Sequence, residues 1–329
     1  MLYKLKYQRV IIIQQTLICL NRMSNNTNLH RAKNTKNDEF YTRIKDIEKE
    51  LKYYKDFFKD KVVYCNCDRA DGEIRSNFFV YFVENFKEFG LKRLICTSYN
   101  KGGKGRLCIY DDETNLNDII DMDGDGDFRS EECVKWLEKC DVVVTNPPFS
   151  LFRDFVAQLV KYDKKFLIIG NMNAITYKDI FPLIKDNKIW LGINAPKAYS
   201  TPLKEVENEK TQYKENGVVY QKFGNHGWFT NIEHSNRIYP LDLYKRYDAE
   251  KYPKYDNYNA INVDKVIDIP CDYDGVMGVP ITFLDKYCPT QFEIVGIANT
   301  VRYMGDFPCL TKVDGKPIYN RILVRKIKS

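Results

Sequence analysis

Short apolar runs alternate along this chain with segments whose apolar residues recur at helical spacing. The runs rich in β-branched and aliphatic residues are 61–68, 94–98, 142–145, 165–170 and 189–193. The helical patterns are 44–58, 77–89 and the stretch from 150 onward. Ser76 and Gly90 predict the two ends of the second helix, and the glycines at 102–105 predict a hairpin into residues 106–110. Strands alternating with helices in this way indicate an α/β fold, and we expect a doubly wound, mostly parallel Rossmann-like sheet.

One strand ends in an unusual way. The buried run Val142–Thr145 is followed by Asn146-Pro147-Pro148-Phe149, and a proline cannot donate to a sheet ladder. Ser150 is expected to cap the helix that comes next. Asn146 to Phe149 should therefore lie at the carboxyl edge of the sheet, where open α/β sheets bind their ligands.

Such a turn suits methylation of a planar amino nitrogen. The lone pair of an exocyclic amine is delocalised, so the nitrogen is a weak nucleophile. If the side-chain oxygen of Asn146 and the carbonyl of Pro147 accept its two hydrogens, the nitrogen can become tetrahedral and attack a sulfonium methyl group. Pro148 keeps the turn rigid, and Phe149 offers a ring on which an extruded base can stack. An ordinary Asn-Pro turn is the alternative.

The first predicted helix and the first predicted strand both present polar groups at an end. Thr42 or a neighbour is expected to cap the helix, whose exposed amides suit the carboxylate of a methionine group, although this segment taken alone favours a plain capped helix. Asn66 and Asp68 close the strand 61–68. Only Gly72 follows in the next loop, where nucleotide-binding loops usually carry several glycines.

The acidic segment from Asp121 to Glu132 matches the calcium-binding loop of an EF-hand at every specified position. EF-hand loops normally lie between two amphipathic helices, and here the preceding segment is short. A second interpretation is that Asp127 accepts the amino group of a bound adenine while Phe128 packs on its ring. A plain acidic loop is the third.

Charge and cysteine content limit the classes of function. The net charge is +6, but residues 1–37 hold seven basic residues and no acid, so the rest carries −1. Net charge is therefore no argument for nucleic-acid binding. The apolar run 10–20 is too short to span a bilayer, and we interpret residues 1–22 as an upstream extension with Met23 as the true start. Ten scattered cysteines indicate a reducing cytosol, and no metal site is expected.

Residues 196–262 differ in pattern from the rest of the chain. Aliphatic runs are few there, and rings alternate with cations: Tyr199, Tyr213, Tyr220, Trp228, Lys245, Arg246, Tyr247, Lys251 and Lys254. Such a mixture favours phosphate contacts and stacking on unpaired bases, with a solvated irregular insertion as the alternative. His226 looks exposed and is expected either to border the base pocket or to serve as a core or capping residue.

Four segments together resemble one family. They are Asp38–Thr42 (DEFYT), Asn66–Asp68 (NCD), Gly126–Ser130 (GDFRS) and Asn146–Ser150 (NPPFS). In this order they resemble the EcoRI-type adenine-specific DNA methyltransferases, and the similarity runs from about Asp38 to about Ala298, including Met277–Tyr287.

The resemblance implies a cofactor, S-adenosylmethionine, and a partner, double-stranded DNA. It places Phe40, Tyr41 and Thr42 at the methionine end of the cofactor. It places Asn66 and Asp68 near the centre of the cofactor, and Asp127 and Phe128 at its adenine. The target base is then held by the catalytic residues Asn146, Pro147, Pro148 and Phe149. A bacterial cytoplasmic enzyme is implied, with no membrane partner and with a cognate restriction endonuclease.

The expected organisation has four parts: a basic N-terminal extension (1–36), a catalytic core that binds the cofactor (37–195), a DNA-recognition region (196–262) and a C-terminal part packed on the core (263–329). The expected function is site-specific methylation of adenine N6 in DNA within a restriction-modification system. Methylation of protein glutamine or RNA amino groups is the alternative in the same class. A non-catalytic nucleic-acid or calcium-binding module is the alternative in another class.

Overall fold

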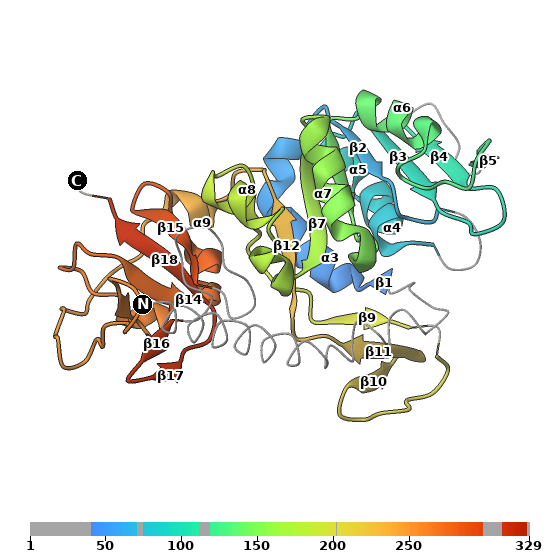
Figure 1. The fold of residues 1–329 in the computed structure, drawn as a ribbon. Helices are drawn as coiled ribbons and strands as arrows, with labels where there is room; N and C mark the ends of the chain where they lie inside the picture. The colour runs from blue at the N-terminus through green and yellow to red at the C-terminus, as the bar shows by residue number, and fades with distance from the viewer. Residues whose placement is uncertain (1–40, 71–74, 112–118, 202, 299–310, 328–329) are drawn as a thin grey trace, which may run out of the picture. The chain divides into compact units, whose positions relative to one another are not determined.

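The computed structural model describes residues 41–70, 75–111, 119–201, 203–298 and 311–327. Its main element is an eight-stranded sheet in the order β5-β4-β3-β2-β6-β7-β12-β8 (Figure 1). The strands are β2 (Val62–Cys65), β3 (Arg93–Ser98), β4 (Arg106–Tyr110), β5 (Ile119–Asp121), β6 (Val142–Thr145), β7 (Lys165–Asn171), β8 (Trp190–Leu191) and β12 (His226–Thr230). The predictions for residues 1–36, for Met23 and for Phe40 lie outside the described residues.

The main sheet is mixed rather than mostly parallel. Strands β3, β2, β6 and β7 run parallel in its centre. Strands β4 and β5 continue the sheet antiparallel beside β3, and β12 and β8 do so beside β7. The loop from Ser98 to Arg106 is too short for a parallel crossover, so β3 and β4 form the hairpin that the glycines predict. The α/β class is confirmed, and the expectation of a mostly parallel sheet is correct only for the four central strands.

Helices cover both faces of this sheet. On one face lie α6 (Glu131–Lys139) and α7 (Phe152–Lys161), whose apolar residues join Phe166 and Ile168 of β7 in the main core. On the other face lie α3 (Ile44–Leu51), the 3₁₀ helix η1 (Lys52–Phe58), α4 (Asn77–Glu84) and α5 (Phe86–Phe89). The ring of Phe78 on α4 meets Trp228 of β12 edge-on at 5.9 Å. Burial on both faces explains why the central strands are continuous apolar runs.

Helix ends follow the sequence signals in part. The side chain of Ser76 caps α4 by accepting from the amide of Phe78, and Gly90 ends α5 with φ of 61°. Ser150 does not cap α7, because Phe149–Leu151 form the 3₁₀ turn η2, closed by a 3.0 Å bond from the amide of Leu151 to the carbonyl of Pro148. The segment 44–58 is divided into α3 and η1, with Arg43 rather than Thr42 at the N-cap.

Residues 196–262 are more regular than their composition indicates. A second sheet contains β1 (Tyr41–Thr42), β9 (Ala198–Ser200), β11 (Val218–Lys222) and β10 (Gln212–Glu215) in that order. Its hairpin turns at Asn216 and Gly217, both with positive φ, as a tight hairpin requires. The next strand, β12, is not part of this second sheet and pairs with β7 in the main sheet. The boundaries proposed for the four parts of the chain stay a prediction.

The C-terminal residues form a third sheet. It contains β13 (Ile261–Asn262), β14 (Met277–Pro280), β18 (Arg321–Lys326) and β15 (Phe292–Ala298) in that order. The small helices α8 (Phe181–Lys185) and α9 (Ser235–Ile238) contact this part, and Phe283 and Phe292 belong to the same apolar core as α7. Among the described residues, no helix is long and apolar enough to cross a membrane.

Candidate active site

The turn Asn146–Phe149 lies where the sequence predicts it, directly after a strand in the centre of the main sheet. All four residues of β6 are buried, Asn146 and Phe149 are half-buried, and Pro148 is exposed. The two prolines end the ladder between β6 and β7 because neither can donate a hydrogen bond. The turn thus presents Asn146 and Phe149 at the carboxyl edge of parallel strands.

Asp68 stabilises this edge of the sheet through hydrogen bonds. It follows β2, its amide donates to the carbonyl of Thr97 at 3.0 Å, and its carboxylate accepts from the hydroxyls of Ser76 and, at 2.5 Å, of Thr145. Thr145 is the residue before Asn146, so Asp68 fixes the start of the turn. Burial raises the pKa of Asp68 to about 6, although the two hydroxyl bonds oppose that shift.

Two buried oxygens beside this edge have no hydrogen-bond partner among the described residues. They are Oγ1 of Thr42 in β1 and Oδ1 of Asn66, which follows β2. The carbonyl of Thr42 accepts from the side chain of Asn77 at 2.7 Å, which attaches β1 to the start of α4. A buried oxygen without a partner costs about 1–3 kcal/mol. These two atoms are therefore candidates to accept hydrogen bonds from a ligand.

Asp127 and Phe128 are placed differently from the two buried oxygens. Both carboxylate oxygens of Asp127 accept from the guanidinium of Arg129, at 2.9 and 2.6 Å, and these bonds lower the pKa of Asp127. Phe128 is buried and packs edge-on against Phe155 at 4.9 Å. An adenine that bonds to Asp127 would have to share this carboxylate with Arg129. The assignment of both residues to the cofactor stays a prediction.

The acidic segment is a tight loop whose carboxylates bind protein groups. Asp121 lies in β5 and pairs with Arg106 of β4, and Glu132 accepts from the amides of Asp123 and Gly124 at 3.1 and 3.4 Å. Gly126 has φ of 82°, and a Cβ there would lie 2.3 Å from the carbonyl oxygen of Ser98. Across the described ranges, no group of three His, Cys, Asp or Glu side chains could hold a metal ion.

His226 is buried, although it looks exposed in the sequence, and a core position was one of its two expected places. It is 7% exposed, its Nδ1 lies 2.9 Å from the hydroxyl of Tyr199, and its ring centroid is 4.4 Å from that of Phe149. Phe223 stacks on the imidazole at 4.9 Å. The structure therefore places His226 against the predicted catalytic turn. Phe223 is a site residue that sequence reasoning missed, and Tyr199 was assigned to DNA contact rather than to the surroundings of the turn, because only the pairing of β9 and β12 with distant strands brings them here.

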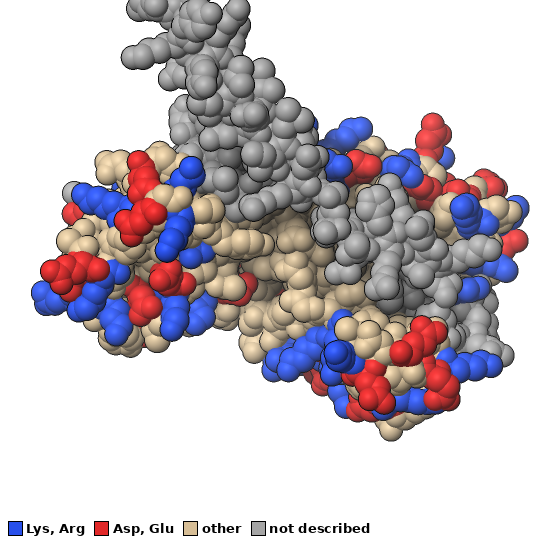
Figure 2. All heavy atoms as spheres, turned by 60° about the horizontal axis from the view of Figure 1, so that its bottom comes forward, with Lys and Arg blue, Asp and Glu red and all other residues tan. Residues whose placement is uncertain are grey.

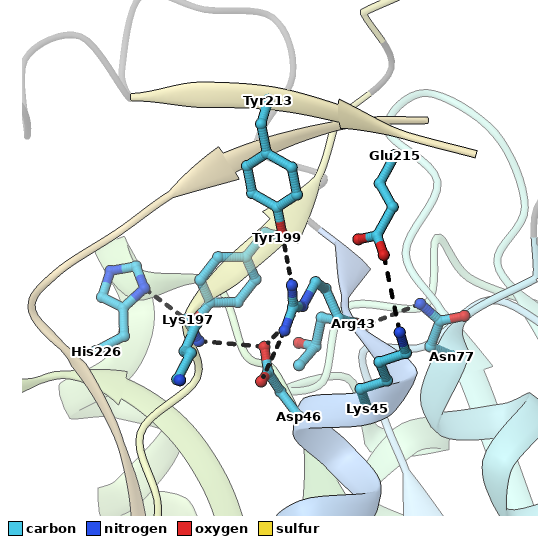
Figure 3. Close-up of polar contacts among 10 residues, drawn as sticks. Arg43, Lys45, Asp46, Asn77, Lys197, Tyr199, Tyr213, Glu215 and His226 are labelled. Atoms are coloured by element: carbon cyan, nitrogen blue, oxygen red, sulfur yellow. Dashed lines mark hydrogen bonds and ion pairs between the residues drawn. The ribbon is translucent and has the colours of Figure 1, made fainter. Parts of the chain in front are cut away.

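The strand that carries Thr42, β1, is an edge strand of the second sheet, and polar contacts of the neighbouring residues connect it further to that sheet (Figure 3). Thr42 pairs with Tyr199, and the guanidinium of Arg43 donates to the hydroxyl of Tyr213 at 2.5 Å. Asp46 accepts from Arg43 at 3.1 Å and from the amide of Lys197 at 3.1 Å. Residues predicted to bind a cofactor and residues predicted to recognise DNA thus share one sheet.

Both signs of charge are mixed wherever charged side chains gather on the face that Figure 2 shows, and uncharged side chains separate these regions. Lysine and arginine side chains lie beside aspartate and glutamate there. Exposed ion pairs of the chain include Lys214–Glu205 and Arg325–Glu293. Tyr199 and Trp228, which the sequence analysis counts among the rings for DNA contact, are both fully buried. Neither ring can stack on a nucleic acid unless it first becomes exposed.

Comparisons with known proteins agree with the motifs. The family model described as adenine-specific methyltransferase EcoRI matches residues 28–326. The chain is 46% identical to the type II methyltransferase M.EcoRI of Escherichia coli, over 92% of this chain and 98% of that protein. It is 40% identical to M.MpnI of Mycoplasma pneumoniae, over 81% and 84% of the two chains, and 37% identical to M.MgeORF184P of Mycoplasma genitalium, over 90% and 98%. No solved structure matches the chain.

Proposed function

The chain belongs to the EcoRI family of adenine-specific methyltransferases and is a site-specific DNA methyltransferase, and we propose that Asn146–Phe149 hold its target adenine for methylation at N6. The observation that carries this proposal is the position of the turn. It follows the central strand β6, its two prolines restrict the backbone, and Asp68 fixes its start through Thr145. A planar amine placed there meets two oxygen acceptors and an aromatic ring.

The residues of the turn act on the amine by orienting it. The side-chain oxygen of Asn146 and the carbonyl of Pro147 accept its two hydrogens, which favours a tetrahedral nitrogen with a directed lone pair. The same two oxygens stabilise the positive charge that develops on the nitrogen. Phe149 holds the extruded base by stacking. The bond from Thr145 to Asp68 keeps the turn in place, so little reorganisation is needed during the reaction.

The residues beside the turn fit S-adenosylmethionine. Thr42 and Asn66 offer buried oxygen acceptors, and this cofactor carries an ammonium group and ribose hydroxyls that can donate to them. Tyr41 belongs to the same strand as Thr42, and Asp127 and Phe128 remain the proposed neighbours of the adenine ring. When bound, the cofactor supplies the electrophilic methyl group.

We also propose roles for the main sheet, for residues 196–262 and for a partner enzyme. The main sheet is interpreted as doubly wound, because helices cover both of its faces. Residues 196–262 serve as the region that recognises double-stranded DNA, and a restriction endonuclease of the same specificity acts beside the enzyme in the bacterial cytoplasm. The paired charges on the surface favour recognition through individual contacts over attraction by a broad basic patch.

The test uses the full chain, S-adenosylmethionine and bacterial genomic DNA amplified in vitro, which contains no methylated adenine or cytosine. Mass spectrometry of the digested DNA should find N6-methyladenine, and sequencing of modified bases should place it within one short motif. RNA and a denatured protein mixture serve as competing acceptors. Methyl transfer only to RNA or to glutamine would overturn the proposal, as would methylation of another DNA base.

A further inference from the structure

Behind the catalytic turn lies a cluster of three aromatic residues. Its members, Tyr199, Phe223 and His226, come from β9, from the segment before β12 and from β12 itself. Tyr199 is fully buried, and His226 is 7% exposed. Tyr199 and Phe223 both contact the imidazole of His226, and the imidazole contacts Phe149.

The contacts leave the imidazole little freedom to rotate. Its Nδ1 and the hydroxyl of Tyr199 lie 2.9 Å apart, which fixes the direction in which Nδ1 points. Phe223 stacks on one face with an interplanar angle of 21°. The Phe149 ring leans on the same imidazole at 4.4 Å and 55°. The orientation of Phe149 therefore depends on a histidine that a tyrosine hydroxyl holds.

Tyr199 also connects the turn with the proposed cofactor strand. It pairs with Thr42 across β1 and β9, and Figure 3 shows its hydroxyl directed at His226. Tyr199 and His226 thus connect Thr42 with Phe149 through direct contacts. A shift of β1 would move the residue that holds the imidazole.

Burial makes His226 suited to supporting the Phe149 ring and unsuited to binding phosphate. It lowers the pKa of the imidazole to about 4, so the ring is neutral near pH 7. A neutral ring can accept from the hydroxyl of Tyr199 or donate to it, according to its tautomer. A cation in contact with DNA would need the opposite environment.

We propose that Tyr199 and His226 are positioning residues for methyl transfer, whose hydrogen bond sets the plane of Phe149 on which the target adenine stacks. The inference rests on the proposed function. Neither residue has to touch the base. The imidazole supports the Phe149 ring from the protein side and leaves the rest of that ring to the adenine.

The test compares three variants with the wild-type chain in single-turnover methylation of the amplified genomic DNA. Tyr199→Phe removes only the hydroxyl, His226→Phe keeps a ring without the hydrogen bond, and the third variant combines both. Each single substitution should slow methyl transfer about tenfold, the loss expected for one hydrogen bond. The double variant should be no slower than either single variant, because both changes remove the same bond. The KM for S-adenosylmethionine should stay within about twofold.

Tyr54→Phe provides the matched control. Tyr54 is also buried, and its hydroxyl donates to Glu50 at 3.0 Å, away from the turn. This variant should lose thermal stability and keep the wild-type rate of methyl transfer. A slower rate in Tyr199→Phe would then result from a displaced Phe149 ring and not from lower stability.

Three results would overturn the proposal. They are a wild-type rate in Tyr199→Phe, a rate loss in Tyr54→Phe equal to that in Tyr199→Phe, and multiplication of the single effects to about a hundredfold in the double variant. If Tyr199→Phe does not fold, His226→Phe decides alone. A wild-type chain that methylates no DNA would instead refute the proposed function, so the two failures are distinguishable.

Discussion

Two stretches of this chain match known motifs closely, and the fold uses them differently. Asn146–Phe149 follows the central strand β6, and Asp121–Glu132 begins in β5 at the end of the main sheet. The first stretch presents a half-buried amide and a half-buried ring at the carboxyl edge of parallel strands. The second directs its carboxylates at Arg106 and at amides of its own loop.

The difference shows that position in the sheet matters as much as the motif itself. Gly126 fits the calcium-loop pattern, but in this fold it is required because the loop passes close to the carbonyl of Ser98. In the same way, Asp125 accepts from the amide of Asp127 and stabilises the turn. A residue pattern can thus serve a turn as well as it serves a metal ion. The following predictions test whether the two stretches differ in function as they do in structure.

The largest effect is expected for Asn146→Ala. It removes one of the two acceptors that orient the amine, so methyl transfer should fall by about 10²–10³-fold. Binding of S-adenosylmethionine, measured by calorimetry, should change little. Asn85→Ala is the matched control, because the side-chain amide of Asn85 donates to the carbonyl of Tyr81 in the α4–α5 junction. Full activity of Asn146→Ala would contradict the mechanism.

Phe149→Ala should have the next largest effect. Stacking of a base on an aromatic ring contributes about 1–3 kcal/mol, so kcat/KM for DNA should fall about 10- to 100-fold. Phe149→Tyr keeps the ring and should restore most of the activity. Steady-state kinetics with varied DNA would measure both variants. Equal rates for Phe149→Ala and the wild type would show that the ring does not hold the base.

The sequence predicted the parts of the molecule that depend on local pattern. The strand before Asn146, the cap at Ser76 and the stop at Gly90 each follow from neighbouring residues. The brace from Asp68 to Thr145 joins residues 77 positions apart, and the contact of Phe149 with His226 requires β12 to pair with β7. No periodicity reports such contacts. Burial of Tyr199 and Trp228 was missed for the same reason, because ring-rich segments have similar compositions in a core and on a surface.

Asp68→Asn should change stability rather than the contact with the base, and the size of the change should depend on pH. The folded pKa of about 6 lies above the unfolded value near 4, so the native state holds its proton longer and loses stability as pH rises between these values. The asparagine variant lacks this loss. Its free energy of unfolding relative to the wild type should therefore rise by about 2–3 kcal/mol between pH 4 and pH 7. Urea denaturation at several pH values in this range would measure the free energy of unfolding of both proteins. If the two free energies changed in parallel with pH, the pKa of Asp68 in the folded protein would not be raised.

The smallest effects are expected in the acidic loop. Glu132→Gln keeps an oxygen that can accept from the amides of Asp123 and Gly124, so stability should change by less than about 1 kcal/mol, whereas Glu132→Ala should cost about 0.5–1.5 kcal/mol. Methyl transfer should stay at the wild-type rate in both variants, since Glu132 contacts only its own loop in these bonds. Millimolar calcium should leave thermal unfolding of the wild type unchanged, whereas saturation to a hundred times a dissociation constant would add about 2.7 kcal/mol. A calcium-dependent rise in Tm that Glu132→Gln removes would mean that this loop, like Asn146–Phe149, is a ligand site, and the contrast between the two stretches would then lie only in which ligand each one binds.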